Sequence, residues 1–142
     1  MSIEDKLTGA PKKARKILFL DPFIYHALRA WLFPVKDPYS KQIKPAVQDS
    51  VLASQLIEAI VSSHYYRQYP TYYIKAEGEV DIAYIDQHKF WPIEIKWTNQ
   101  LRPKDLKQIK KYKNSRIFAK VNQIGMFENI PIFPLPLALL RG

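Results

Sequence analysis

Apolar and polar side chains alternate most clearly between residues 79 and 97, and this alternation predicts two strands joined by a tight connection. In the first strand, apolar Val80, Ile82 and Tyr84 alternate with Glu79, Asp81 and Ala83. In the second strand, apolar Trp91, Ile93, Ile95 and Trp97 alternate with Pro92, Glu94 and Lys96. The polar residues 86–89 between them are expected to form a four-residue hairpin loop.

The register of this hairpin decides which side chains meet. If Ile85 pairs with Phe90, Asp81 lies opposite Glu94 and Glu79 lies opposite Lys96, all on one face of the sheet. Directly opposed residues have Cβ atoms about 4.5–5.5 Å apart, so the two carboxylates would repel unless a cation lay between them. Hard divalent cations choose such oxygen ligands, which makes the hairpin a candidate half of a metal site. The alternation alone leaves open that these charges simply form the solvated face of an antiparallel sheet.

Elements before the hairpin follow from similar patterns. The apolar run 16–20 predicts a buried strand, and Asp21 as N-cap with Pro22 at the first position predicts a helix that ends near residue 32, before Pro34. A second helix is expected over residues 50–67, capped by Asp49 or Ser50, and β-branched and aromatic residues 71–74 predict a further strand.

Glu58 falls in the middle of the second helix, which is apolar on two sides and therefore expected to be largely buried. A buried carboxylate without a partner is costly, so Glu58 would need a cation, a lysine or a hydroxyl group. The alternative is that Glu58 lies on the narrow exposed strip of the helix.

Elements after the hairpin are predicted as follows. Pro103 opens a helix of about eleven residues, in which Leu106 and Ile109 pack inward. Strands are expected at residues 116–121 and 130–134, and two prolines keep the second of these short or at a sheet edge. The short apolar helix at residues 136–140 either docks on the core or forms a subunit contact, which leaves a homodimer open.

Basic residues are concentrated between positions 102 and 120, where there is one acid, Asp105, against eight basic residues: Arg102, Lys104, Lys107, Lys110, Lys111, Lys113, Arg116 and Lys120. An ordinary solvated helix would mix the two signs. Such a run suits contacts with phosphates, which give affinity without sequence information. The net charge of +9 likewise favours polyanions, of which nucleic acid is the commonest.

Composition narrows the class of protein. A chain of 142 residues with 47% hydrophobic residues suits one globular domain, in which the polar residues 1–15 are expected to form a loose arm. The absence of cysteine excludes a disulfide framework and a thiolate metal site, and it fits a cytoplasmic location. No apolar run approaches a membrane span, the acidic start argues against a secretory signal, and the four glycines form no phosphate-binding loop.

Three segments carry a resemblance to a known family. Asp81, a spacer of twelve residues and then Glu94-x-Lys96 resemble the motif of the PD-(D/E)XK nuclease superfamily, with Val80 in place of the proline. Together with residues 16–22 and 56–61, the chain is similar over roughly residues 12–135 to the nuclease-like C-terminal domain of archaeal and bacterial AAA+-type ATPases. The resemblance implies an α/β, restriction-endonuclease-like fold with a central mixed β-sheet flanked by helices.

The resemblance also implies roles for individual residues. Asp81, Glu94 and the backbone carbonyl of Ile95 would hold Mg²⁺ or Mn²⁺, Glu58 would complete or orient the site, and Lys96 would position the attacking water or stabilise the developing charge. The implied catalytic residues are therefore Glu58, Asp81, Glu94 and Lys96. The nucleic-acid contacts would come from Lys104, Lys107, Gln108, Lys111 and Tyr112, and the spacing of Gln108 and Tyr112 resembles a helix motif of RecB-like nucleases, where they would orient Lys96 or a phosphate.

The expected activity is metal-dependent hydrolysis of phosphodiester bonds in DNA, by an endo- or exodeoxyribonuclease. One alternative is a nucleic-acid-binding module that keeps the fold without turnover, in which Glu79 pairs with Lys96 and quenches the site. Another is a protein-interaction module related to the same ATPases. Because the chain lacks the ATP-binding module, an ATPase would be a separate partner.

Overall fold

The computed structural model describes residues 16–19, 21–34, 50–75, 77–98 and 100–140. Its centre is a six-stranded mixed sheet in the order β1-β2-β3-β4-β6-β5, in which β3, β4 and β6 are parallel to one another and the other pairs are antiparallel. The strands are β1 (Thr71–Lys75), β2 (Glu79–Asp86), β3 (Lys89–Lys96), β4 (Arg116–Ala119), β5 (Gly125–Phe127) and β6 (Ile130–Pro134). The expected α/β fold with a central mixed sheet is confirmed. The loose arm predicted at residues 1–15 and the alternative cap Asp49 lie outside the described residues.

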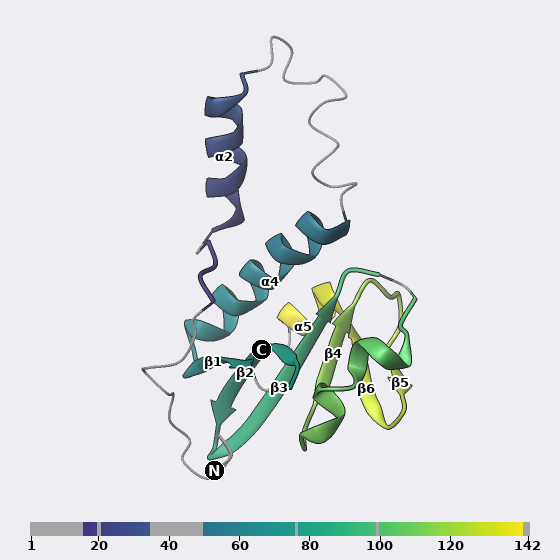
Figure 1. Ribbon diagram of the computed structural model, residues 1–142. Coiled ribbons are helices and arrows are strands. Elements are labelled where there is room, and N and C mark those ends of the chain that lie inside the picture. Colours follow the sequence, from purple (N-terminus) through teal and green to yellow (C-terminus); the bar gives the residue numbers. More distant parts are fainter. Residues whose placement is uncertain (1–15, 20, 35–49, 76, 99, 141–142) are drawn as a thin grey trace.

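Helices cover both faces of this sheet (Figure 1). On one face, α4 (Ser50–Tyr66) and α5 (Leu135–Leu140) pack against a core that includes Ile82, Ile93 and Phe118. On the other face, Leu106 and Ile109 are fully buried against a second core that includes Val80 and Ile117. The sheet is therefore the middle of three layers, as expected for an α/β domain. No helix among the described residues is long and apolar enough to cross a membrane.

Helix α2 (Pro22–Leu32) stands away from the sheet and meets the body of the protein mainly through α4 (Figure 1). Its predicted boundaries are confirmed: Asp21 is the N-cap and accepts a hydrogen bond from the Phe23 amide at 2.8 Å, and Phe33 is the C-cap. The side chains of Phe23 and Trp31 are 71% and 77% exposed, so this helix carries a large uncovered apolar surface.

Three of the predicted elements are wrong in type or extent. The expected strand at residues 16–20 does not form, since residues 16–19 have no regular structure and Ile17 is 94% exposed. The eleven-residue helix is replaced by two short 3-10 helices, Pro103–Leu106 and Ile109–Lys111. In 3-10 geometry residues three positions apart lie on one side, which brings the buried anchors Leu106 and Ile109 together. The hairpin loop has two residues instead of four, because Asp86 and Lys89 pair in the ladder.

At the far edge of the sheet, β5 has no counterpart in the sequence-based prediction. It forms a hairpin with β6 through Glu128 and Asn129, whose φ angles of 45° and 69° lie in the left-handed region. The last predicted strand is confirmed as β6, which is short but not at an edge because β4 and β5 flank it. The two-residue turn between β2 and β3 is also left-handed, with φ angles of 47° and 60° at Gln87 and His88.

Strand β2 contains an irregularity that the alternating pattern does not reveal. Tyr72 pairs with Ala83 and Ile74 pairs with Val80, so two steps along β1 correspond to three along β2. The extra residue is a β-bulge, which locally reverses the alternation of faces. As a result Val80 packs in the core beneath the 3-10 helices, whereas Ile82 packs in the core beneath α4. The predicted uninterrupted alternation across Val80, Ile82 and Tyr84 is therefore wrong at the position of Asp81.

Candidate active site

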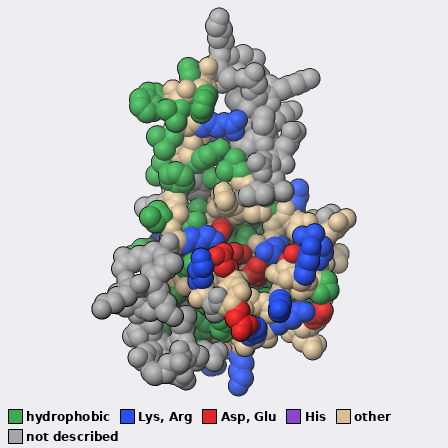
Figure 2. All heavy atoms as spheres, in the orientation of Figure 1, with side chains coloured by type: hydrophobic (Ala, Val, Ile, Leu, Met, Phe, Trp, Pro, Cys, Tyr) green, Lys and Arg blue, Asp and Glu red, His purple; other side chains and the backbone are tan. Residues whose placement is uncertain are grey.

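A cleft of about 650 Å³ opens at the end of β3. On the face shown in Figure 2, acidic side chains gather between lysine and arginine side chains near the middle of the body. The cleft is bordered by α4, by the bulge in β2, by the end of β3 and by the segment that follows β3; its lining residues are Ser54, Gln55, Glu58, Asp81, Ile95, Lys96, Trp97, Thr98, Gln100, Arg102 and Asp105. Three of the four predicted catalytic residues thus line one cleft, and the fourth, Glu94, lies buried beside Lys96.

Asp81 occupies the bulge of β2, where the regular ladder to β3 ends after the pair Ile82–Ile93. Its Oδ2 accepts a hydrogen bond from the Ile95 amide at 2.8 Å, which ties the bulge to β3 and orients the carboxylate. The predicted register is confirmed through the pairs from Ile82–Ile93 to Ile85–Phe90. Burial raises the pKa of Asp81, while the Ile95 amide and the nearby Lys96 and Lys16 ammonium groups act in the opposite direction.

Glu94 is 5% exposed, and its Oε1 lies 2.6 Å from the Lys96 ammonium. Burial, followed by the charge of Asp81, raises the pKa of Glu94 to about 7, in spite of the attraction of Lys96. Burial opposes the charged form of Lys96 as well, but Glu94 and Asp81 outweigh it and raise the pKa of the ammonium. Lys96 is therefore a cation in this site. Glu94, with a pKa of about 7, is partly protonated near neutral pH.

Glu58 is buried at 6% exposure, so the alternative that placed it on an exposed strip is wrong. Its carboxylate forms an ion pair with Lys16, which also lies 3.9 Å from Asp81 Oδ1 and 5.2 Å from the centre of the Tyr73 ring. Burial raises the pKa of Glu58, Lys16 opposes this shift, and the charge of Asp81 adds to it. The expectation that Glu58 needs a lysine or another cation is confirmed. The identity of that lysine was missed, because nothing in the run 16–20 marks it.

Glu79 does not face Lys96, contrary to the prediction. Its carboxylate lies 3.6 Å from Lys75 and accepts a hydrogen bond from the Tyr73 hydroxyl, which is the main cause of its lowered pKa. The physical reason is the bulge in β2, which reverses the alternation of faces for the residues before it, so the uninterrupted alternation behind the prediction does not hold at Glu79. The idea that Glu79 quenches Lys96 loses its structural basis.

Donor chemistry in the cleft suits a hard cation. Asp81, Glu94 and the Ile95 carbonyl are oxygen donors of the kind that Mg²⁺ and Mn²⁺ choose, and Mg²⁺ normally keeps several waters. Within the described ranges, no three histidine, cysteine or acidic side chains come together as a metal cage. Glu58 in particular is engaged by Lys16. The donor set therefore suits a cation held by two carboxylates and completed by water, without Glu58 as a ligand.

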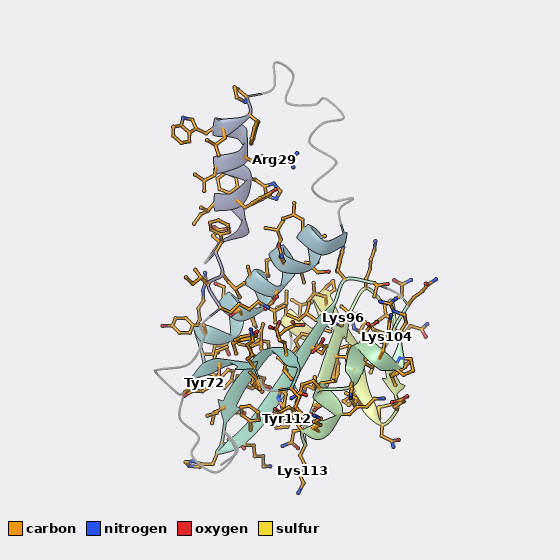
Figure 3. The ribbon with its side chains drawn as sticks, viewed as in Figure 1. Arg29, Tyr72, Lys96, Lys104, Tyr112 and Lys113 are labelled. Carbon is orange, nitrogen blue, oxygen red and sulfur yellow. The ribbon has the colours of Figure 1, made fainter. Side chains whose placement is uncertain are left out.

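The five residues predicted to contact nucleic acid lie outside this cleft. Gln108 Nε2 donates a hydrogen bond to the Tyr112 hydroxyl at 3.3 Å, and Lys111 forms an ion pair with Glu77. In Figure 3, Lys96 and Tyr112 lie toward opposite ends of β3, so Tyr112 is not placed to orient Lys96. Of the basic run 102–120, the residue that lines the cleft is Arg102, whose Nε lies 2.9 Å from Asp105 Oδ2.

Fold and cleft together define an α/β domain with an acidic cleft neutralised by two lysines. The chain belongs to the family described as a domain of unknown function, DUF4143, whose model matches residues 49–134. The match runs from α4 to β6 and includes Glu58, Asp81, Glu94 and Lys96, but it does not include Lys16. Searches among curated proteins and among solved structures find no match to this chain.

Proposed function

We propose that this domain hydrolyses phosphodiester bonds of DNA in a reaction that depends on Mg²⁺ or Mn²⁺. The observation that carries the proposal is that Asp81 and Lys96 line one cleft, with the buried Glu94 paired to Lys96 and Asp81 tied to the Ile95 amide. Burial raises the pKa of both carboxylates, and the charge of Asp81 adds to the shift at Glu94, so a bound divalent cation would stabilise their charged forms. The resemblance to the PD-(D/E)XK nucleases supports the same assignment.

Each residue has a defined task in this proposal. Asp81, Glu94 and the Ile95 carbonyl would hold the cation, which would supply Lewis-acid chemistry toward a phosphate and a bound water. Lys96 is cationic and stands at the end of β3, where it stabilises charge that develops on the phosphate. Glu58 neutralises the charge of Lys16, which also lies close to Asp81.

Nicking of supercoiled plasmid tests the proposal, alongside labelled linear, branched and single-stranded DNA in Mg²⁺, Mn²⁺ or EDTA. The wild type should cleave only with metal, and Asp81→Asn and Lys96→Met should abolish cleavage. Glu79→Gln is the matched control, because Glu79 is an exposed carboxylate on the same hairpin, and it should retain activity. Equal cleavage by wild type and Asp81→Asn would show that the activity does not arise at this cleft.

A second candidate is a nucleic-acid-binding module without turnover. It is favoured by the two ammonium groups, since Lys16 pairs with Glu58 and Lys96 pairs with Glu94, so both carboxylates already have a counter-ion. Binding without cleavage on every substrate would select it. In that case Lys104→Glu and Lys107→Glu should weaken binding to all sequences and reduce the slope of log K against log salt by about 0.9 for each lost phosphate contact on duplex DNA. A separate ATPase is a proposed partner under either candidate.

A further inference from the structure

A second cavity, of about 690 Å³, lies at the opposite end of the sheet from the acidic cleft. Strand β3 runs from Lys89 to Lys96, with Trp91 near its start and the predicted catalytic residues near its end. Arg116, which begins the parallel strand β4, is therefore at the same end as Trp91. The lining residues of this cavity include none of those that line the acidic cleft, so the two are separate sites.

Arg116 is held in this cavity by an unusual set of contacts. Its guanidinium carbon lies 4.3 Å from the centre of the Trp91 ring and 5.9 Å from that of Phe133, and Nη1 donates a hydrogen bond to the Tyr84 hydroxyl at 3.2 Å. A guanidinium has five N–H donors, and Tyr84 accounts for one of them. In the described part of the chain, no ion pair includes Arg116. A half-buried arginine fixed in this way is preorganised to receive an anion.

Charge and aromatic surface surround Arg116 in the cavity wall. Lys113 and Lys110 also line it, and the acid on the wall, Glu128, forms an ion pair with Lys110. Tyr112 and Phe133 supply aromatic surface. In Figure 3, Tyr112 and Lys113 lie together at the end of the sheet remote from Lys96, and Lys113 points away from the body. Cationic groups beside aromatic rings form the combination that binds a phosphate together with a planar base.

We propose that this cavity binds a nucleotide, with its phosphate on the Arg116 guanidinium, its base against the aromatic wall, and Lys113 at the rim adding positive charge. The volume of about 690 Å³ is within the usual range of small-ligand pockets, about 300–1,000 Å³. The planar arginine fork suits the two oxygens of a phosphate, and the rings suit any base because every base has a π face. The nucleotide is either free or at the end of a strand. The site does not depend on cleavage at the acidic cleft.

Isothermal titration calorimetry of the full chain with adenosine 5′-monophosphate, adenosine and inorganic phosphate tests this site. The wild type should bind the monophosphate at least tenfold more tightly than either fragment. Arg116→Gln should weaken binding at least tenfold, and Arg116→Lys should restore little of it, because lysine keeps the charge but lacks the planar fork. Arg102→Gln is the matched control, an exposed arginine paired with Asp105 in the other cleft, and it should bind like the wild type.

Lys113→Gln is a second test variant that should fold normally, because Lys113 is exposed and its replacement leaves the packing of Arg116 intact. It should weaken monophosphate binding several-fold at an unchanged melting temperature. Displacement of the monophosphate by a 5′-phosphorylated oligonucleotide, but not by the unphosphorylated one, would assign the site to strand ends, and failure of both to displace it would assign the site to free nucleotides. Three results would each overturn the proposal: no binding of the monophosphate, equal affinity for phosphate alone, or unchanged affinity in both Arg116→Gln and Lys113→Gln. Asp81→Asn should leave this affinity unchanged, which separates the site from the proposed nuclease activity.

Discussion

Replacement of Glu94 by Gln should stabilise the protein in a way that depends on pH. The pKa of Glu94 is about 7 in the folded protein, against an ordinary value of 4.5, so the folded state binds its proton more tightly than the unfolded chain does. The stability contributed by the neutral carboxyl is therefore complete below pH 4.5 and is lost as the pH rises through about 7. Glutamine resembles the neutral carboxyl at every pH, so the variant does not suffer this loss.

The size of the effect follows from the same pKa shift. One pKa unit corresponds to about 1.36 kcal/mol, so a shift from 4.5 to about 7 predicts a difference of about 3 kcal/mol between the variant and the wild type at pH 9. For a protein of this size, 3 kcal/mol corresponds to roughly 10 °C in melting temperature. Near pH 4 the variant and the wild type should be almost equally stable, because Glu94 is then protonated in both the folded and the unfolded wild type.

Urea unfolding of both proteins at pH 4 and pH 9, without divalent metal, measures this difference. The control is Glu79→Gln on the same hairpin, where the exposed Glu79 has a lowered pKa, so its loss should act in the opposite direction and only weakly. If the stability difference between Glu94→Gln and the wild type is the same at both pH values, burial and Asp81 do not raise the pKa of Glu94, and the electrostatic account of the cleft fails.

The remaining predictions concern the lysine partner, the hairpin turn and the second core. Lys16→Met should lower the free energy of unfolding at pH 8 by about 1–3 kcal/mol, because it leaves the buried Glu58 carboxylate without its ammonium, and it should strengthen Mn²⁺ binding in calorimetry; a variant as stable as the wild type would contradict the ion pair. His88→Gly should raise the free energy of unfolding by about 1 kcal/mol in urea titrations, since His88 has a φ of 60° and glycine adopts that conformation without strain; a decrease would count against the two-residue turn. Leu106→Ala should cost about 2–5 kcal/mol because Leu106 is fully buried, whereas the exposed neighbour Lys107→Ala should change stability by about 0.5 kcal/mol or less; equal effects in urea unfolding would refute the packing of this segment.

The spacing of apolar residues predicted those helices and strands in which the apolar positions are also the buried ones. The helix α4 and the register of the β2–β3 hairpin follow from apolar spacing, whereas the same spacing left Glu58 either buried or on an exposed strip, and the structure shows it buried. The resemblance supplied the candidate site, and the structure brings Glu58, Asp81 and Lys96 to one cleft.

What could not be predicted depends on contacts between segments that are distant in sequence. The bulge at Asp81 is visible only in the pairing of β2 with β1, because Val80 and Ile82 are apolar whether they face one core or two. Lys16 reaches Glu58 and Asp81 from a segment without regular structure, which carries no periodic signal. The cavity at Arg116 needs β3, β4 and β6 side by side, and parallel pairing is invisible in a local pattern.

The placement of the two lysines has a consequence for the order in which the protein assembles. Lys96 stands two positions after Glu94 on the same strand, so the β2–β3 hairpin carries one counter-ion with it from the moment it forms. Hairpins close through local contacts and form early, whereas the parallel pairings of β3 with β4 and of β4 with β6 require longer connections and form later. Lys16 reaches Asp81 only when its distant segment docks. Asp81 and Glu94 therefore share the Lys96 ammonium during early folding, and refolding should proceed faster at low pH or high salt, where the repulsion between these two carboxylates is weakest.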